Sequence, residues 1–219
     1  IGSSGSGKTT LASLIPRFYD ATAGTVLVDG LDVREYTFDA LYNKLGYVTQ
    51  KAVLFSGTVE DNVFFGQSAA EKTDASLQAA LSLSQAAEFV DKYPEKAAHP
   101  IAQLGRNVSG GQKQRLSIAR ALARTPEILI FDDSFSALDY KTDATLREGL
   151  AKELPGTTKI IVAQRISTIR NADQILVLDR GEIAGLGTHD ALMASCTVYR
   201  EIAMSQLSEE ELKKGGASK

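Results

Sequence analysis

The chain has 219 residues, and its shares of hydrophobic residues (43%) and charged residues (23%) are ordinary for one globular domain with a sizeable core. The formal net charge of −3, without a dominant basic stripe, gives no reason to expect a nucleic-acid partner. The single cysteine, Cys196, excludes a disulfide within the chain, and no apolar run in the sequence is long enough to span a membrane.

Helical and strand patterns alternate along the chain. The spacing of apolar residues predicts helices over residues 9–17, 73–93 and 111–124. Short apolar runs predict strands over residues 25–28, 45–49, 128–131, 160–162 and 174–178, the last paired as a hairpin with 182–187. The continuous runs at 128–131 and 160–162 fit strands that are buried on both faces of a parallel sheet.

This alternation predicts an α/β fold with a mostly parallel sheet and an inserted helical subdomain. We expect the core over residues 1–50 and 124–219, and the helical subdomain over 51–123. The stretch 99–108 reads as a loop. The tail over 206–219 is charged and then rich in Gly and Ser, which predicts a frayed helix end.

The chain opens on a loop that matches the phosphate-loop pattern G-x-x-x-x-G-K-[ST] at every specified position. Its glycines let the backbone aim several N–H groups at phosphate oxygens, Lys8 can reach the β- and γ-phosphates, and the Thr9 hydroxyl can coordinate Mg²⁺. The alternative interpretation is a flexible Gly/Ser linker that happens to contain Lys-Thr. The predicted phosphate contacts are Gly2, Ser3, Ser4, Gly5, Ser6, Gly7, Lys8, Thr9 and Thr10. Because such a loop normally follows a buried strand, we expect the N-terminal strands of the fold to be missing here.

The apolar run at 128–131 ends in two carboxylates, Asp132 and Asp133. A strand-end acid is the expected partner of a phosphate loop, and Asp132 would hold Mg²⁺ through water. Asp133, one position further on, would face the attacking water. The alternative interpretation is that the two acids only cap the strand. The presence of a phosphate loop in the same chain weakens this alternative.

Residues 108–115 have the sequence Val-Ser-Gly-Gly-Gln-Lys-Gln-Arg, which restricts the families of phosphate-loop proteins to which the chain can belong. At a helix start, Ser109 can hydrogen-bond a phosphate oxygen, and Gly110 and Gly111 allow close approach of the backbone. An ordinary N-cap serine would explain Ser109 but not the rest of the stretch. The run Ser109, Gly110, Gly111 and Gln112 closely resembles the signature sequence of ABC ATPases.

The resemblance to ABC ATPases covers nearly the whole chain, with the parts in the family's order. Gln50 follows a strand as the family's Q-loop glutamine does, and residues 136–139 look like the D-loop, with Asp139 as its acid. Gln164 falls where the family's switch histidine should be.

This resemblance implies a P-loop NTPase with a RecA-like core that uses ATP and Mg²⁺. It implies that Thr9, Gln50 and Asp132 serve the metal. It also implies that ATP lies between two such domains, because each site joins the phosphate loop of one domain to the signature of the other.

Residues 16–20 and 54–59 resemble the ATPase domains of ABC exporters in particular. In that branch the ATPase is fused behind a transmembrane domain, which implies a location on the cytoplasmic face of the cell membrane. Gln50 would lie at the contact with the transmembrane domain. The aromatic residue that stacks on adenine in this family would lie before Ile1.

Two positions depart from the family's pattern, which has Glu at the position of Asp133 and His at the position of Gln164. Aspartate draws the carboxylate back by about 1 Å, and a misplacement of that size can cost about 10²-fold in rate. Gln164 can hydrogen-bond a γ-phosphate but cannot carry positive charge. The pattern resembles the slow-site subunit of heterodimeric bacterial exporters, with a non-identical partner that carries the competent site. The alternative is a homodimer that tolerates both changes.

Other classes of ABC ATPase stay open. A soluble ATPase acting on DNA would carry a long coiled coil, and no heptad run is present, whereas one acting on ribosomes would carry a second cassette, which could lie outside this chain. An importer ATPase made as a separate subunit would begin with its own methionine and strands. A regulatory module that does not hydrolyse ATP is a further alternative, which differs from the slow-site interpretation only in the degree of hydrolysis.

Overall fold

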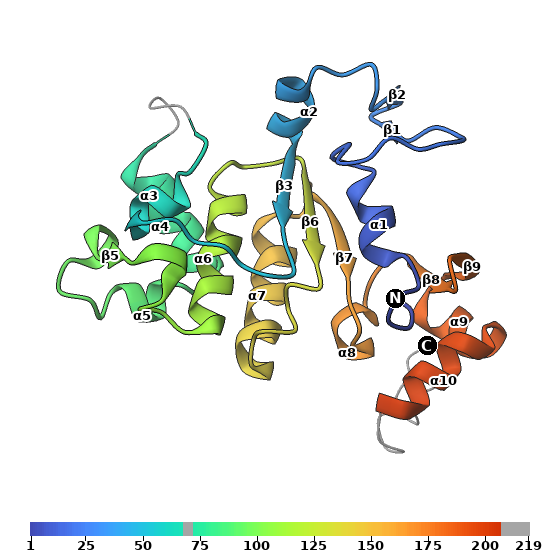
Figure 1. Ribbon diagram of the computed structural model, residues 1–219. Helices are drawn as coiled ribbons and strands as arrows, with labels where there is room; N and C mark the ends of the chain where they lie inside the picture. The colour runs from blue at the N-terminus through green and yellow to red at the C-terminus, as the bar shows by residue number, and fades with distance from the viewer. Residues whose placement is uncertain (68–71, 207–219) are drawn as a thin grey trace.

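The computed structural model describes residues 1–67 and 72–206 and has helices on both faces of a short parallel sheet (Figure 1). The sheet has the order β3 (Leu45–Val48), β6 (Ile128–Asp132), β7 (Thr158–Val162), and both neighbouring pairs are parallel. The α/β class and the parallel sheet predicted from the apolar runs are therefore confirmed. Most of the predicted tail, residues 207–219, lies outside the described residues.

Alternate side chains of the central strand β6 face different helices, as the two-residue period of a strand requires. Leu129 and Phe131, both 0% exposed, pack in one cluster with α6 (Gly110–Leu122) and α7 (Tyr140–Glu153). Ile130 packs on the other face with Ala12 of α1 (Lys8–Ser13). The helix that follows the phosphate loop and the helix that begins at the signature thus lie on opposite faces of the sheet.

Helix α1 ends at Ser13, earlier than the predicted residue 17. Pro16 disfavours a helical conformation at the residue before it, and Arg17 has a φ of 57°, in the left-handed region. The apolar spacing continues past these residues, so a prediction from the helical period alone overestimated the length of the helix.

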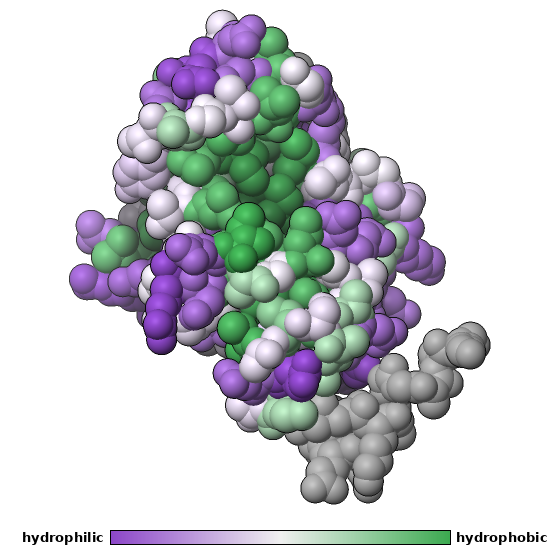
Figure 2. All heavy atoms as spheres, turned by 90° about the vertical axis from the view of Figure 1, so that its right-hand side faces the viewer, coloured by the Kyte–Doolittle hydropathy of each residue, from purple (hydrophilic) through white to green (hydrophobic). Residues whose placement is uncertain are grey.

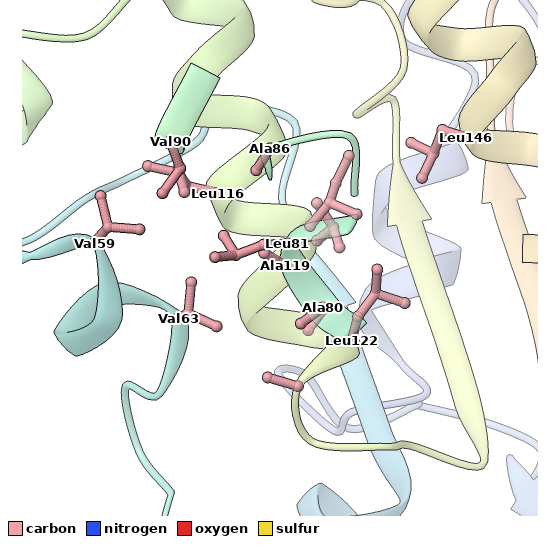
Figure 3. Close-up of a cluster of buried hydrophobic side chains, with 14 of the residues drawn as sticks. Val59, Val63, Ala80, Leu81, Ala86, Val90, Leu116, Ala119, Leu122 and Leu146 are labelled. Atoms are coloured by element: carbon pink, nitrogen blue, oxygen red, sulfur yellow. The ribbon is translucent and has the colours of Figure 1, made fainter. Parts of the chain in front are cut away.

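Between β3 and β6 the chain builds a mostly helical region. Its elements are β4 (Gly57–Thr58), α3 (Val59–Val63), α4 (Asp74–Leu83), α5 (Ala87–Val90), the short 3-10 helices η2 (Lys96–Ala98) and η3 (Gln103–Gly105), β5 (Pro100–Ile101) and α6. Figure 3 shows buried side chains of this region, among them Val59, Val63, Leu116 and Leu122, and Leu146 of α7 belongs to the same cluster. The same cluster includes residues of the sheet, so the helical region and the sheet share one core.

The single helix predicted over 73–93 is wrong, because the chain forms α4 and α5 with a break between them. Ser84 is fully buried, and its hydroxyl donates to the Leu81 carbonyl and accepts from the Ala86 N–H. Gln85 has a φ of 60°. A local hydrogen bond of this kind competes with the helix and explains the break. The predicted loop over 99–108 is broken by β5 and η3, which are both very short.

The predicted C-terminal hairpin is confirmed as β8 (Ile175–Asp179) paired antiparallel with β9 (Glu182–Gly187). The remaining elements are β1 (Leu27–Val28), β2 (Leu31–Asp32), α2 (Phe38–Lys44), α8 (Ile166–Ile169), α9 (His189–Ser195) and α10 (Thr197–Gln206). Tyr199 of α10 is fully buried against the hairpin and α8. No helix within the described ranges is both long and apolar enough to cross a membrane.

An apolar pocket of about 270 Å³ separates β7 from β8. The residues that line it include Leu11 and Ile15 after the phosphate loop, Ile160 of β7 and Leu176 of β8. Figure 2, which views this side, shows hydrophobic side chains gathered over a broad surface. In the described parts of the chain, β7 and β8 are not paired with each other.

Candidate nucleotide-binding site

The phosphate loop lies at the N-terminus beside β8, to which Gly2 forms a parallel bridge at Leu178 (Figure 1). Gly5 and Gly7 have φ values of 77° and 96°, which favour glycine over residues with a Cβ. The Lys8 Nζ folds back over the loop and donates to the carbonyls of Gly2 (2.9 Å) and Ser3 (2.7 Å). The ammonium group therefore lies within the turn that the loop makes, where a phosphate would meet both it and the loop N–H groups.

The strand-end acid Asp132 lies against the start of α1. The Thr9 hydroxyl donates to its Oδ1 at 2.8 Å, and the Tyr47 hydroxyl donates to its Oδ2 at 3.2 Å. Asp132 is only 4% exposed. Burial, and secondarily the charge of Asp132, raise the pKa of Tyr47 to about 12, which keeps its hydroxyl a donor near neutral pH.

A hydroxyl beside a buried carboxylate is the kind of oxygen set that Mg²⁺ takes from proteins when phosphates and water supply its other ligands. No group of three or more His, Cys, Asp or Glu side chains that could hold a metal occurs in the described ranges. Thr9 and Asp132 thus fit a magnesium ion that arrives with a nucleotide better than one held by protein side chains alone.

The second acid, Asp133, joins two glutamines from separate loops. Its Oδ2 accepts from the Nε2 of Gln50 at 2.9 Å and from the Nε2 of Gln164 at 2.7 Å. Its own N–H donates to the Val162 carbonyl at the end of β7, and its φ is 48°, a region that aspartate tolerates better than most residues. Three of the residues singled out in the sequence therefore meet at one carboxylate, next to Asp132.

The signature residues lie elsewhere, at the start of α6. The Ser109 hydroxyl accepts from the Gln112 N–H, and the Gln112 side chain accepts from the Ser109 N–H, which forms a capping box. A Cβ built on Gly110 would meet no atom of the described residues within 4 Å, and one built on Gly111 would make only an ordinary contact. Neither glycine has a positive φ, so the fold of this chain does not require glycine at either position.

The D-loop acid, Asp139, caps α7. Its side chain accepts from the N–H groups of Lys141 and Thr142 and from the Thr142 hydroxyl, and the Thr142 hydrogen bonds lower its pKa. The Ser136 hydroxyl donates to the Asp133 carbonyl. This loop is thereby tied to the second acid, while Thr10 lies exposed on α1.

Two side chains at the site were not singled out from the sequence. Tyr47 reaches Asp132 from the neighbouring strand. Gln206, the last described residue of α10, donates to the Gln164 carbonyl at 2.7 Å and accepts from the Ile166 N–H at 2.9 Å. Their contacts join segments far apart in the sequence, and neither residue belongs to a sequence motif that could have identified it.

This chain is similar in sequence to known proteins. The family model described as "ABC transporter" matches residues 1–136. An uncharacterized ABC transporter ATP-binding protein of Mycobacterium bovis is 49% identical over 94% of this chain and 35% of its own length. The ATP-dependent lipid A-core flippase of Syntrophus aciditrophicus is 42% identical over 97% of this chain and 35% of its own length.

Among solved structures, a bacterial Atm1-family ABC exporter with ATP bound superposes with a TM-score of 0.90 at 38% identity. The match covers 95% of this chain and 36% of that chain. The chain thus spans about a third of the length of these relatives.

Proposed function

Because the chain belongs to the ABC transporter family, we propose that it is the ATP-binding and ATP-hydrolysing domain of an exporter. The observation that carries the proposal is the hydrogen bond between Thr9, which follows the phosphate loop, and Asp132 at the end of β6, with Asp133 as the next residue and bound to Gln50. A hydroxyl, a buried carboxylate and a second carboxylate at one sheet edge are the parts that phosphoryl transfer needs for metal, phosphate and water.

Phosphate binding falls to the loop amides, over residues 2–10, and to the Lys8 ammonium. The Lys8 Nζ, which donates to the carbonyls of Gly2 and Ser3, would turn its hydrogen bonds to phosphate oxygens when a nucleotide binds. Thr9, Asp132 and Gln50 serve the metal; Gln50 uses its amide nitrogen toward Asp133, which leaves its amide oxygen to approach a cation. When bound, Mg²⁺ neutralises charge that develops on the phosphates.

The catalytic pair, Asp133 and Gln164, makes the site slow. The Asp133 carboxylate is the group that would orient and polarise the attacking water, but two amide donors occupy its Oδ2. Gln164 stands where a histidine could share the charge of the γ-phosphate, and its neutral amide cannot do so. The chain therefore retains ATP and turns it over slowly.

The signature residues act on the site of a second nucleotide-binding domain, proposed to be non-identical and catalytically competent. Ser109 to Gln112 lie across the sheet from the phosphate loop of this chain. The free space over Gly110 supports the idea that another molecule approaches there, because no contact among the described residues needs that glycine.

A fused transmembrane domain on the N-terminal side completes the proposed exporter, which places this chain on the cytoplasmic face of the cell membrane. Two observations support this. The relatives are about three times as long as the chain, and two of them are described as a flippase and an exporter. The apolar pocket between β7 and β8 is a surface against which more chain would pack.

ATP binding to the full-length protein tests the proposal. Lys8→Ala removes the cation that meets the phosphates and should weaken binding of ATP by about 10²-fold or more, the effect of losing a charged hydrogen-bonding partner. Lys51→Ala, next to Gln50, is the matched control and should bind as the wild type does. Equal affinity of wild type and Lys8→Ala would refute the assignment of the loop.

A further inference from the structure

Tyr47 approaches the metal-binding acid from the neighbouring strand. In the parallel pair, Tyr47 stands opposite Ile130, so both side chains leave the same face of the sheet. Asp132 follows two residues after Ile130 and shares that face. The tyrosine side chain thus needs only to lean along the strand for its hydroxyl to reach Oδ2 of Asp132, at 3.2 Å.

The two oxygens of Asp132 have different partners. Oδ1 accepts from Thr9, on the phosphate-loop side, and Oδ2 accepts from Tyr47, on the side of β3. The carboxyl group of an aspartate otherwise has a broad range of rotation about its last bond. With both oxygens engaged, it has one orientation.

Contacts elsewhere hold the Tyr47 ring itself. The Phe18 ring meets it edge-on, with centroids 5.2 Å apart and planes at 62°. The ring also lines an open groove of about 430 Å³, together with Pro16, Tyr42 and Arg120. The ring contacts do not involve the hydroxyl, so removal of the oxygen alone changes its contacts with Asp132 and with the Ser13 side chain and leaves the ring packing.

We propose that Tyr47 is a positioning residue for Mg²⁺: it holds Oδ2 of Asp132 so that Oδ1 faces the cation that Thr9 coordinates. This inference rests on the proposed Mg²⁺–ATP site. Its specific content is that the hydroxyl of Tyr47 contributes to nucleotide binding only through the metal. A nucleotide without Mg²⁺ would meet the loop amides and Lys8, whose ammonium group hydrogen-bonds within the loop, whereas the Tyr47 hydroxyl bonds Asp132.

The test compares Tyr47→Phe with Tyr36→Phe in the full-length protein. Tyr36 is the matched control, because its hydroxyl also donates one hydrogen bond, to the Val28 carbonyl at 2.9 Å, but outside the site. Displacement of the fluorescent analogue TNP-ATP by ATP gives the affinity in EDTA and across a Mg²⁺ titration.

We expect Tyr47→Phe to raise the Mg²⁺ concentration needed for half-maximal enhancement of ATP binding by about tenfold, the equivalent of one net hydrogen bond of about 1.4 kcal/mol. Its ATP affinity in EDTA should stay within about twofold of the wild type, and Tyr36→Phe should match the wild type in both conditions.

A Tyr47→Phe protein that loses affinity equally with and without Mg²⁺ would show general damage and overturn the inference. So would one that follows the wild type throughout. A wild-type protein that binds ATP with no response to Mg²⁺ would refute the metal site itself, which separates failure of the proposed function from failure of this inference.

Discussion

The strand-end acids and the signature are the two regions that the sequence marks most clearly, and they differ in what they touch. Asp132 and Asp133 are buried, and their oxygens bind residues from distant parts of the same chain. Gly110 is exposed and Gly111 is partly buried, and no contact among the described residues requires glycine at either position. This difference is what the proposed function expects if the strand-end acids belong to a site within the chain and the signature serves a site on a second domain.

The largest effect should come from filling the space over the signature. Gly110→Val should lower ATP turnover of the full-length protein, assembled with its proposed catalytic partner, by about 10²- to 10³-fold. Loss of preorganised hydrogen-bond donors has an effect of this size. Its melting temperature should stay near that of the wild type, because a Cβ at this exposed position would meet no atom of the described residues within 4 Å.

Gly46→Ala is the variant to compare with Gly110→Val, because it adds a side chain inside the fold. A Cβ there would lie 2.8 Å from Leu129 and 2.9 Å from Pro126, so it should cost about 1–3 kcal/mol in the free energy of unfolding. Calorimetry on both variants checks the contrast. If Gly110→Val destabilised the fold as much as Gly46→Ala, the signature would have a role inside the chain and the comparison would fail.

A cavity beneath α6 should affect stability rather than chemistry. Leu116 is 0% exposed and lies in the shared core shown in Figure 3. Leu116→Ala should lower the free energy of unfolding by about 2–5 kcal/mol, measured by urea denaturation. Because helical region and sheet share this core, the loss should appear in one cooperative transition. Two separate transitions would mean that the helical region unfolds on its own.

The smallest effect should come from the end of α10. Gln206→Leu removes both hydrogen bonds that hold the backbone around Gln164 and Ile166. Amide exchange at Ile166 should become about tenfold faster, since its N–H loses its acceptor. Met204→Leu, an exposed change on the same helix, is the control. Unchanged exchange at Ile166 would show that another contact holds this loop.

Periodicity predicted the central elements of the fold well and their ends poorly. The apolar run at 128–131 identified β6 because a strand covered on both faces excludes polar residues. Helix α1 ends near Pro16 and helix α4 ends at the Ser84 hydroxyl. Both residues interrupt a helix locally although the apolar spacing continues. Helix α7 was not predicted, because Leu146 and Leu150 of its buried face stand among many polar and charged residues.

The site could be predicted only as far as its parts form motifs. Lys8, Thr9, Asp132 and the signature each belong to a short pattern with a physical reason for its residues. Tyr47 and Gln206 belong to no such pattern, because their partners come from other strands and helices and appear only once the chain has folded. The structure also shows that Gln50 and Gln164 share one acceptor, which spacing could not indicate.

Steady-state ATP turnover of the full-length protein tests the central claim most directly. Asp133→Glu combined with Gln164→His restores the residues whose replacement is held to slow the site, and Lys8→Ala supplies the blank. We predict that the wild-type protein without a partner stays near the blank and that the double variant turns over at least about 10²-fold faster, the scale expected from moving a carboxylate by about 1 Å. A wild-type protein that already hydrolyses ATP as fast as the double variant would contradict the slow-site account and favour a homodimer.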